Sequence, residues 1–243
     1  MNVKYFVSFF VAALLMACTP PEKPLEDIFC NKELEEFIGG ADSLPLIPLH
    51  YKTFKDSIDY YMAPFIKMST ADIKYRVQIT PDSNFKPINV KVWYTNPNRP
   101  PAMEKLDIIE VRLNSAGHIL FEGDLLERDS VAKGIYTYFR KRYDRDNYSF
   151  ESIKHTGIYF MWDSGVDQMY FDEVLWSIVD GNIDFLEYVC MIEYDKSICE
   201  MDEAEKKSVL DNMAFKLWLH SKTPYHAPLI PAPPPPPSYF NGE

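Results

Sequence analysis

Four acidic side chains cluster in the second half of the chain: Asp163, Asp167, Asp172 and Glu173. Carboxylates brought together in this way can bind calcium or act as an acid–base pair. Calcium needs about six to eight oxygen ligands, however, and these spacings lack the alternation of a calcium loop such as the EF-hand. Acids at the start of a helix are favoured by the helix dipole. We therefore expect a solvated loop before a helix, with Asp163 capping the turn after its strand.

The histidines and serines lack catalytic spacing. The sequence contains no HExxH pair, no GxSxG serine and no Gly-rich phosphate loop, and its histidines are scattered (His50, His118, His155, His220 and His226). The sequence therefore predicts no catalytic residue, no metal, no cofactor and a non-enzymatic protein.

The cysteines suggest different chemistry. Cys190 and Cys199 close a loop of about ten residues and are a candidate disulfide, provided that their Cα atoms lie within about 7 Å. None of the four cysteines belongs to a CxxC motif or a Cys/His cluster with zinc spacing. Cys18 directly follows Leu15, Met16 and Ala17, at the end of an apolar segment that carries one positive side chain, Lys4.

That segment resembles the signal peptide of bacterial lipoproteins, with residues 15–18 as the lipobox. The resemblance implies that residues 1–17 are removed and that Cys18 is acylated on its thiol and its amino group. A short transmembrane anchor and an ordinary signal peptide are the alternatives. Thirteen apolar residues span only about 20 Å as a helix, less than the ~30 Å hydrocarbon core. The triplet before Cys18 also lacks a small residue at its first position, which an ordinary signal peptide would have.

The lipid would hold the protein at a membrane, because two or three acyl chains anchor far better than one. Thr19 stands where an aspartate favours inner-membrane retention in well-studied lipoproteins, so we expect the outer membrane, facing the periplasm or the cell surface. Removing residues 1–17 leaves 226 residues and lowers the formal charge from −11 to −12. This charge argues against nucleic acid as a partner and predicts that the protein reaches the membrane through its lipid.

Aromatic side chains are concentrated between residues 136 and 150. Core packing accounts for Tyr138 and Phe139, whereas Tyr143 and Tyr148 lie among charged residues, beside Arg142 and Arg145. We take these last four residues as the candidate interface with an envelope protein partner.

The elements that position these residues indicate an α+β fold, a small mixed sheet with helices on one face and Pro-rich extended arms at both ends. We expect a tether at 18–49, a helix and two strands within 50–100, an α+β domain at 106–222 and a Pro-rich tail at 223–243. The unbroken apolar run at 158–162 predicts a strand covered on both faces, at the centre of the sheet. A helix begins near Tyr170; whether it ends at 180–182, and whether 187–194 extends it or forms a strand, stay open. Residues 202–219 read as a further amphipathic helix.

Residues 106–194 resemble the periplasmic domain of the ExbD/TolR family, which partners proton-driven motors of the inner membrane. The resemblance lies in the phrase from Val111 to Ile119, in residues 121–123, and in the strand ending at Asp163 before a helix that opens with an aromatic residue. Members of that family carry an aspartate in a membrane helix. Residues 5–17 contain no acid, so the resemblance implies a relative without a proton-conducting helix.

Three functions follow from these patterns. The first is a lipid-anchored envelope protein that acts in binding or assembly. The second is an envelope hydrolase or glycan-active lipoprotein, with a site assembled from distant acids. The third is a peripheral subunit of a secretion or gliding machine, contacted through the Pro-rich tail.

Overall fold

The computed structural model describes residues 32–40, 42–49, 54–67, 71–80, 87–95, 107–213 and 215–222. The expected signal peptide, Cys18, the tether up to residue 31, the Pro-rich stretch at 96–101 and the Pro-rich tail lie outside these residues.

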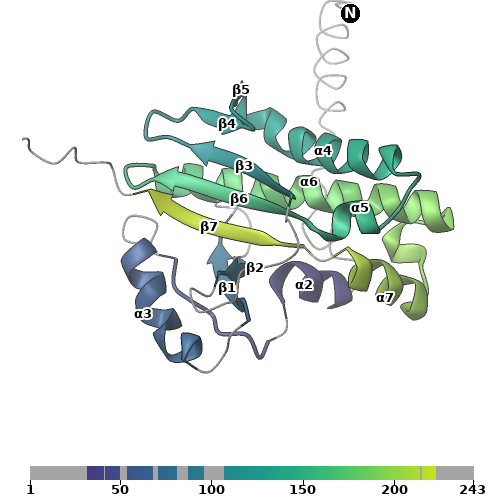
Figure 1. Ribbon diagram of the computed structural model, residues 1–243, viewed down its shortest axis with the longest axis horizontal. Coiled ribbons are helices and arrows are strands. Elements are labelled where there is room, and N and C mark those ends of the chain that lie inside the picture. The colour runs from purple at the N-terminus through teal and green to yellow at the C-terminus, as the bar shows by residue number, and fades with distance from the viewer. Residues whose placement is uncertain are drawn as a thin grey trace, which may run out of the picture.

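The described residues form one mixed sheet of seven strands in the order β1-β2-β7-β6-β3-β4-β5 (Figure 1). The α+β class is therefore confirmed, with a larger sheet than expected. The strands are β1 (Ile73–Ile79), β2 (Ile88–Tyr94), β3 (Asp107–Leu113), β4 (Ile119–Phe121), β5 (Asp124–Leu126), β6 (Thr156–Asp163) and β7 (Leu217–Lys222).

The centre of the sheet is strand β6, as its apolar run predicts. It pairs in parallel with β3 on one side and with β7 on the other. Ile158, Phe160 and Trp162 are almost fully buried, and Met161 on the alternate face is only 6% exposed. Both faces of β6 are thus covered, which is why no polar residue alternates in this strand.

Helices α4 (Val131–Arg145) and α6 (Gln168–Tyr194) pack against each other and cover one face of the sheet (Figure 1). The ring of Phe171 in α6 stacks on Phe160 of β6 with centroids 5.3 Å apart. Phe139 of α4 stacks on Phe185 of α6 at the same separation. These aromatic contacts join the two helices and the sheet into one hydrophobic core.

Helix α6 resolves the two alternatives left open above. It continues through residues 180–182 and includes 187–194, because Gly181 lies against α4 and Val189 and Cys190 are buried in the core. It ends at Asp195, whose φ of 53° is left-handed, the common end of an α-helix.

The expected helix at 202–219 is wrong in its second half. Helix α7 covers Glu203–Asn212, and the chain then enters β7, whose pairing with β6 runs from Leu217 to Lys222. Trp218 also pairs with Trp93, so β7 joins the β1–β2 hairpin to the rest of the sheet. The other helical segments among the described residues are α2 (Lys32–Gly39), α3 (Phe54–Ile66), α5 (Glu151–Lys154) and the 3₁₀ turns η2 (Arg128–Ser130) and η3 (Ile198–Glu200).

Candidate functional site

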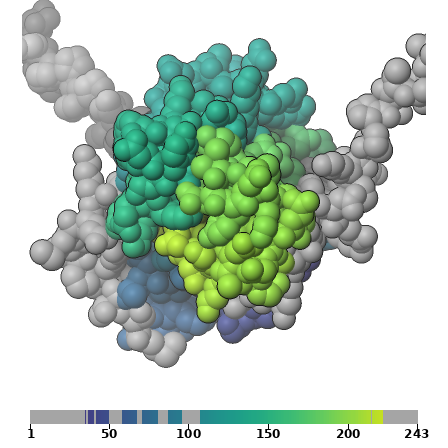
Figure 2. Space-filling model, turned by 90° about the vertical axis from the view of Figure 1, so that its right-hand side faces the viewer, coloured from purple at the N-terminus to yellow at the C-terminus, as the bar shows by residue number. Residues whose placement is uncertain are grey.

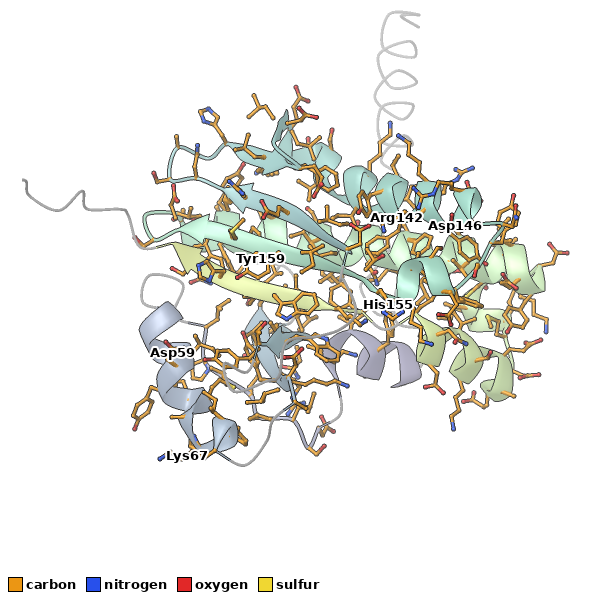
Figure 3. The ribbon with its side chains drawn as sticks, in the orientation of Figure 1. Asp59, Lys67, Arg142, Asp146, His155 and Tyr159 are labelled. Carbon is orange, nitrogen blue, oxygen red and sulfur yellow. The ribbon has the colours of Figure 1, made fainter. Side chains whose placement is uncertain are left out.

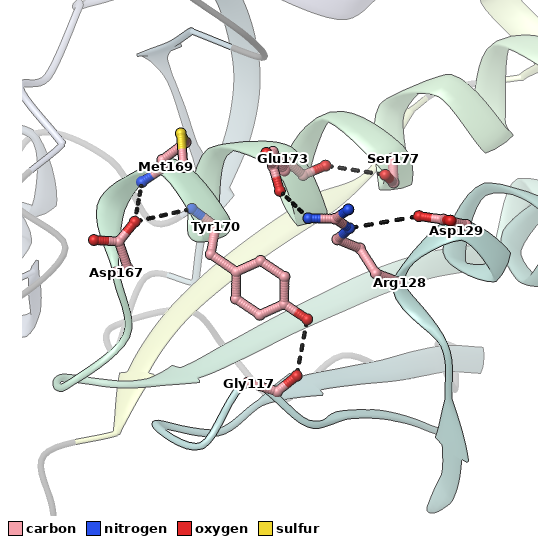
Figure 4. Close-up of polar contacts among 8 residues, drawn as sticks. All are labelled: Gly117, Arg128, Asp129, Asp167, Met169, Tyr170, Glu173 and Ser177. Carbon is pink, nitrogen blue, oxygen red and sulfur yellow. Dashed lines mark hydrogen bonds and ion pairs between the residues drawn. The ribbon is translucent and has the colours of Figure 1, made fainter.

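The four acids of the cluster stabilise local structure, and Figure 4 shows the contacts of two of them, Asp167 and Glu173. The Asp167 carboxylate caps α6 by accepting hydrogen bonds from the backbone N–H groups of Met169 (2.9 Å) and Tyr170 (3.4 Å). Asp163 accepts one from the backbone N–H of Ser115 at 3.1 Å, across the neighbouring loop. Asp167 thus lies at the start of a helix, as expected, whereas the Asp163 carboxylate stabilises the turn between β3 and β4 and not the turn after its own strand.

The other two acids have side-chain partners. Asp172 accepts a hydrogen bond from Gln168 (2.9 Å), and its burial raises its pKa to about 6. Glu173 pairs with Arg128 at 2.8 Å, and that guanidinium lies 5.9 Å from the ring centroid of Tyr170. Among the described residues, no three His, Cys, Asp or Glu side chains are placed to share a metal ion.

The predicted disulfide between Cys190 and Cys199 is wrong. Cys190 is a free thiol, fully buried in α6, whereas Cys199 is exposed in η3 and disulfide-bonded to another residue. A short spacing brings two cysteines together only if the chain turns back between them. Here Cys190 is buried in the core near the end of α6, whereas Cys199 is exposed in η3.

The four candidate interface residues separate into a buried and an exposed group. Tyr143 is fully buried: its ring packs against those of Tyr148 and Phe185, and its hydroxyl donates a hydrogen bond to Glu193. It therefore belongs to the core and not to a surface, although charged residues flank it in the sequence. Burial, and then the bond to Glu193, raise its pKa, so its hydroxyl stays protonated.

Arg142, Arg145 and Tyr148 remain at the surface. Arg142 is partly buried, pairs with Asp107 and lies 4.9 Å from the ring centroid of Tyr138. Arg145 is well exposed and pairs with Asp146 at 3.2 Å. Figure 3 places Arg142 and Asp146 on the C-terminal half of α4, at one end of the molecule.

A further group of polar and aromatic side chains lies at this end of the molecule. The sequence did not predict it, because its members come from two helices, α4 and α6. The guanidinium of Arg140 lies 4.7 Å from the ring centroid of Tyr188 and 5.9 Å from that of Tyr136. Asp144 accepts a hydrogen bond from the Tyr188 hydroxyl at 2.7 Å and pairs with Arg140 at 3.4 Å. Burial and the bond to Asp144 raise the pKa of Tyr188. The group thus holds a fixed cation against aromatic rings.

Apolar side chains adjoin this group. Met191 and Ile192 follow Tyr188 by three and four residues in α6, so they lie on the same side of the helix. They are 49% and 44% exposed. We call the surface formed by Arg140, Arg145, Tyr148, Tyr188, Met191 and Ile192 the distal surface. Figure 2 views this end of the molecule, where the C-terminal parts of α4 and α6 meet α7.

The backbone at the distal surface is strained. Asn147 and Tyr148 both have left-handed φ values, 54° and 59°. This conformation costs about 1–2 kcal/mol in a residue such as Tyr148, whereas asparagine adopts it more readily. The same loop holds Tyr148 half-exposed, with its ring edge against Tyr143. Strain of this kind concentrates where a side chain is held in place for a function.

The chain matches no protein-family model, and no curated protein is significantly similar to it in sequence. Within the described residues, no helix has both the length and the apolar character needed to cross a bilayer.

Proposed function

We propose that this chain is a lipid-anchored protein of the bacterial cell envelope, without enzymatic activity, that binds a protein partner through its distal surface. The observation that carries the proposal is the disulfide of Cys199. Disulfides form and persist in oxidising compartments outside the cytoplasm and are rare inside it. The resemblance of residues 15–18 to a lipobox independently supports a location outside the cytoplasm, with Cys18 as the lipidated residue.

The resemblance to the ExbD/TolR periplasmic domain adds support. It implies the order strand, turn, strand, helix, strand, helix, and the segment from β3 to α6 has this order, apart from the short strand β5 and helix α5. Strands β3 and β6 are parallel, with α4 in the connection between them. The absence of an acid from residues 5–17 argues for binding or assembly without proton transfer.

The composition of the distal surface favours a protein partner. Tyr, Met and Arg are enriched at protein interfaces, and truncating Tyr or Arg there often costs the most binding energy. Arg140 and Tyr188 are already fixed by their contacts, so little side-chain entropy remains to be lost when a partner binds. Asp144 and Asp146 are paired with Arg140 and Arg145. The exposed side chains of Tyr148, Met191 and Ile192 are left for recognition.

The anchor is tested by labelling cells with an alkyne fatty acid and separating their membranes. We expect the wild-type chain to carry the label and to sediment with the outer membrane. The Cys18→Ala chain should lose the label and the N-terminal processing. Equal labelling of both chains would overturn lipidation at Cys18.

The partner surface is tested by placing a photo-crosslinking amino acid at Tyr148 in intact cells. Tyr60 of α3 is the matched control, because it is an aromatic residue that is 77% exposed but lies far from α4 in the fold. We expect a discrete crosslinked product from position 148 and none of the same mass from position 60. Identical products from both positions, or none from position 148, would contradict the proposed surface.

A further inference from the structure

The solvent-facing side of helix α4 differs in charge from the rest of the protein. The chain as a whole has 36 acidic and 25 basic residues. The fifteen residues of α4, in contrast, include five basic side chains and one acidic side chain. Four of the five basic side chains are exposed, and we call these four the basic face of α4: Lys133, Arg140, Lys141 and Arg145. The first three are seven and eight residues apart, two helical turns, so they lie on one side of the helix.

The helix dipole accounts for only part of this charge. Cations are favoured in the last turn of a helix, where Arg142 and Arg145 lie. Lys133 lies in the first turn, where the dipole disfavours a cation, and that turn contains no acidic residue. The charge of Lys133 therefore does not serve the stability of its own helix, which indicates a role in binding.

The basic face keeps unneutralised charge and free N–H donors. Arg140 and Arg145 each pair with a neighbouring acid, at 3.4 and 3.2 Å. Neither Lys133 nor Lys141 forms an ion pair within the part of the chain that the structure describes. Among the same residues, Arg140 donates two of its five N–H groups, to its neighbouring acid and to a tyrosine hydroxyl. Positive charge and donors thus remain for an anionic ligand.

Exposed acids lie on both sides of the basic face. On one side, Glu122 of the β4–β5 hairpin lies close to Tyr138, whose pKa is raised by burial and then by the charge of Glu122. On the other side, Asp184 lies one turn before Tyr188 in α6, and the Tyr188 ring centroid is 6.1 Å from that of Tyr136 in α4. Figure 1 shows the hairpin beside the first half of α4, and α6 alongside the helix. The basic face is therefore only one helix wide.

We propose that the basic face binds an acidic polypeptide segment of the protein partner. Lys133 and Arg145 are twelve residues apart, which makes the basic face about 18 Å long, the span of about five or six extended residues. An anionic membrane is the alternative. A flat bilayer that faced α4 would also meet the acids on both sides, whereas a single extended segment fits between them.

This inference rests on the proposed function, because it names the chemistry of the partner bound there. The basic face and the distal surface share Arg140 and Arg145, so one partner can contact both. Exposed charges set the orientation and the rate of association more than the affinity. We therefore assign the acidic segment to orienting the partner along α4, and the side chains of Tyr148, Met191 and Ile192 to holding it.

Binding of an acidic peptide tests the inference directly. The full chain, purified in a non-ionic detergent, is titrated into fluorescein-labelled octaglutamate, and the fluorescence anisotropy is followed at low and at physiological salt. Because the protein as a whole repels this peptide, binding needs a local positive site. We expect saturable binding that weakens about fivefold at physiological salt, since salt screens exposed charges. An anisotropy that stays flat at low salt would overturn the inference.

Two charge-matched double variants locate the site. Lys133→Gln with Lys141→Gln removes the two cations without ion pairs and should weaken octaglutamate binding about tenfold at low salt. Lys67→Gln with Lys207→Gln is the matched control, because it also removes two exposed lysines, one directly after α3 and one in α7. We expect this control to weaken binding less than about twofold. Equal losses in the two double variants would show that the peptide responds to net charge alone, and would refute a site on α4.

The membrane alternative has its own measurement. The chain is mixed with vesicles of phosphatidylcholine, with or without phosphatidylglycerol, and acetylation of Lys133 and Lys141 by an N-hydroxysuccinimide ester is followed by mass spectrometry. We expect equal rates with both kinds of vesicle and slower acetylation when octaglutamate is added. Protection of the two lysines by phosphatidylglycerol and not by octaglutamate would assign the basic face to the bilayer, against our proposal.

Photo-crosslinking in cells separates this inference from the proposed function. With the crosslinker at Tyr148, the chain with Lys133→Gln and Lys141→Gln should give about fivefold less product than the chain with both lysines. An unchanged yield would count against the acidic segment and leave the distal surface intact. Octaglutamate binding without any product from position 148 would support the acidic ligand and remove the partner from the distal surface.

Discussion

Gly181 of α6 and Ala132 of α4 bring the two helix backbones into direct contact. A Cβ atom on Gly181 would lie 2.3 Å from the carbonyl oxygen of Ala132. Cβ atoms do not approach backbone atoms this closely, so any larger residue here must push the helices apart. The glycine therefore permits the close crossing on which the paired core of α4 and α6 depends.

We predict that Gly181→Ala destabilises the protein by about 2 kcal/mol, although alanine is the better helix former by about 1 kcal/mol. The measurement is urea denaturation followed by far-UV circular dichroism. Gly134→Ala is the matched control in α4, since the nearest atom to its new Cβ is a Leu126 methyl at 3.3 Å, which can move. We expect this control to be neutral or up to about 1 kcal/mol more stable. A stabilising Gly181→Ala would show that the helices can separate at no cost.

Truncating Tyr143 should destabilise the protein much more than truncating Tyr148. Tyr143 is fully buried, so Tyr143→Ala is expected to cost about 3–5 kcal/mol, and Tyr143→Phe about 1 kcal/mol through the lost bond to Glu193. Tyr148 is 49% exposed, and Tyr148→Ala should cost less than about 1 kcal/mol. Thermal melts of the three variants measure this. Similar losses from the two alanine variants would contradict the division into core and surface.

Local patterns in the sequence predict those elements whose environment is uniform along their length. The apolar run at 158–162 identifies β6 as the central strand, because only a strand covered on both faces has no polar alternation. Strand β7 was not predicted, because Val209, Met213 and Leu217 keep helical spacing beyond Asn212, where α7 ends. Residues 217–222 form a strand because of contacts that are distant in the sequence. They lie between β2 and β6 and pair with both strands.

The candidate site was harder to predict than the fold. Arg140, Tyr136 and Tyr188 lie on two helices whose relative position depends on the Gly181 crossing, and no sequence spacing encodes it. Neighbouring charges made Tyr143 look like a surface residue. Its place in the helix gives the better signal, since Val131, Ile135, Phe139 and Tyr143 repeat every four residues and all are buried.

Cys190 should resist alkylation in the folded protein. Burial, reinforced by the charge of Glu187, raises the pKa of its thiol to about 12, so at pH 8 only about one molecule in ten thousand carries the reactive thiolate. Iodoacetamide should modify Cys190 in denaturant but not in buffer. Cys199 in the reduced protein is the internal control, because its exposed position should allow modification in the folded state. Equal rates at both cysteines in buffer would contradict the burial of Cys190.

Asp180 should make the stability of the protein depend on pH. It lies in α6 beside Gly181, and its burial, together with the nearby charge of Asp184, raises its pKa from 3.8 to about 6 in the folded state. Below about pH 4 the carboxyl is protonated in the folded and unfolded chains alike. Between about pH 4 and 6 the unfolded chain releases its proton while the folded chain keeps it, so stability falls as the pH rises, and the full loss persists above pH 6.

Asp180→Asn removes this ionisation and nearly preserves side-chain shape and helix propensity. Two pKa units correspond to about 3 kcal/mol, and the partial exposure of the carboxyl reduces the effect, so we expect a gain of about 1–2 kcal/mol at pH 7.5. At pH 4 the gain should shrink to less than about 0.5 kcal/mol. Urea denaturation at the two pH values measures both quantities, with the exposed Asp124→Asn in β5 as control. An equal gain at both pH values would assign the effect to packing, because only an ionising carboxyl makes the difference disappear in acid.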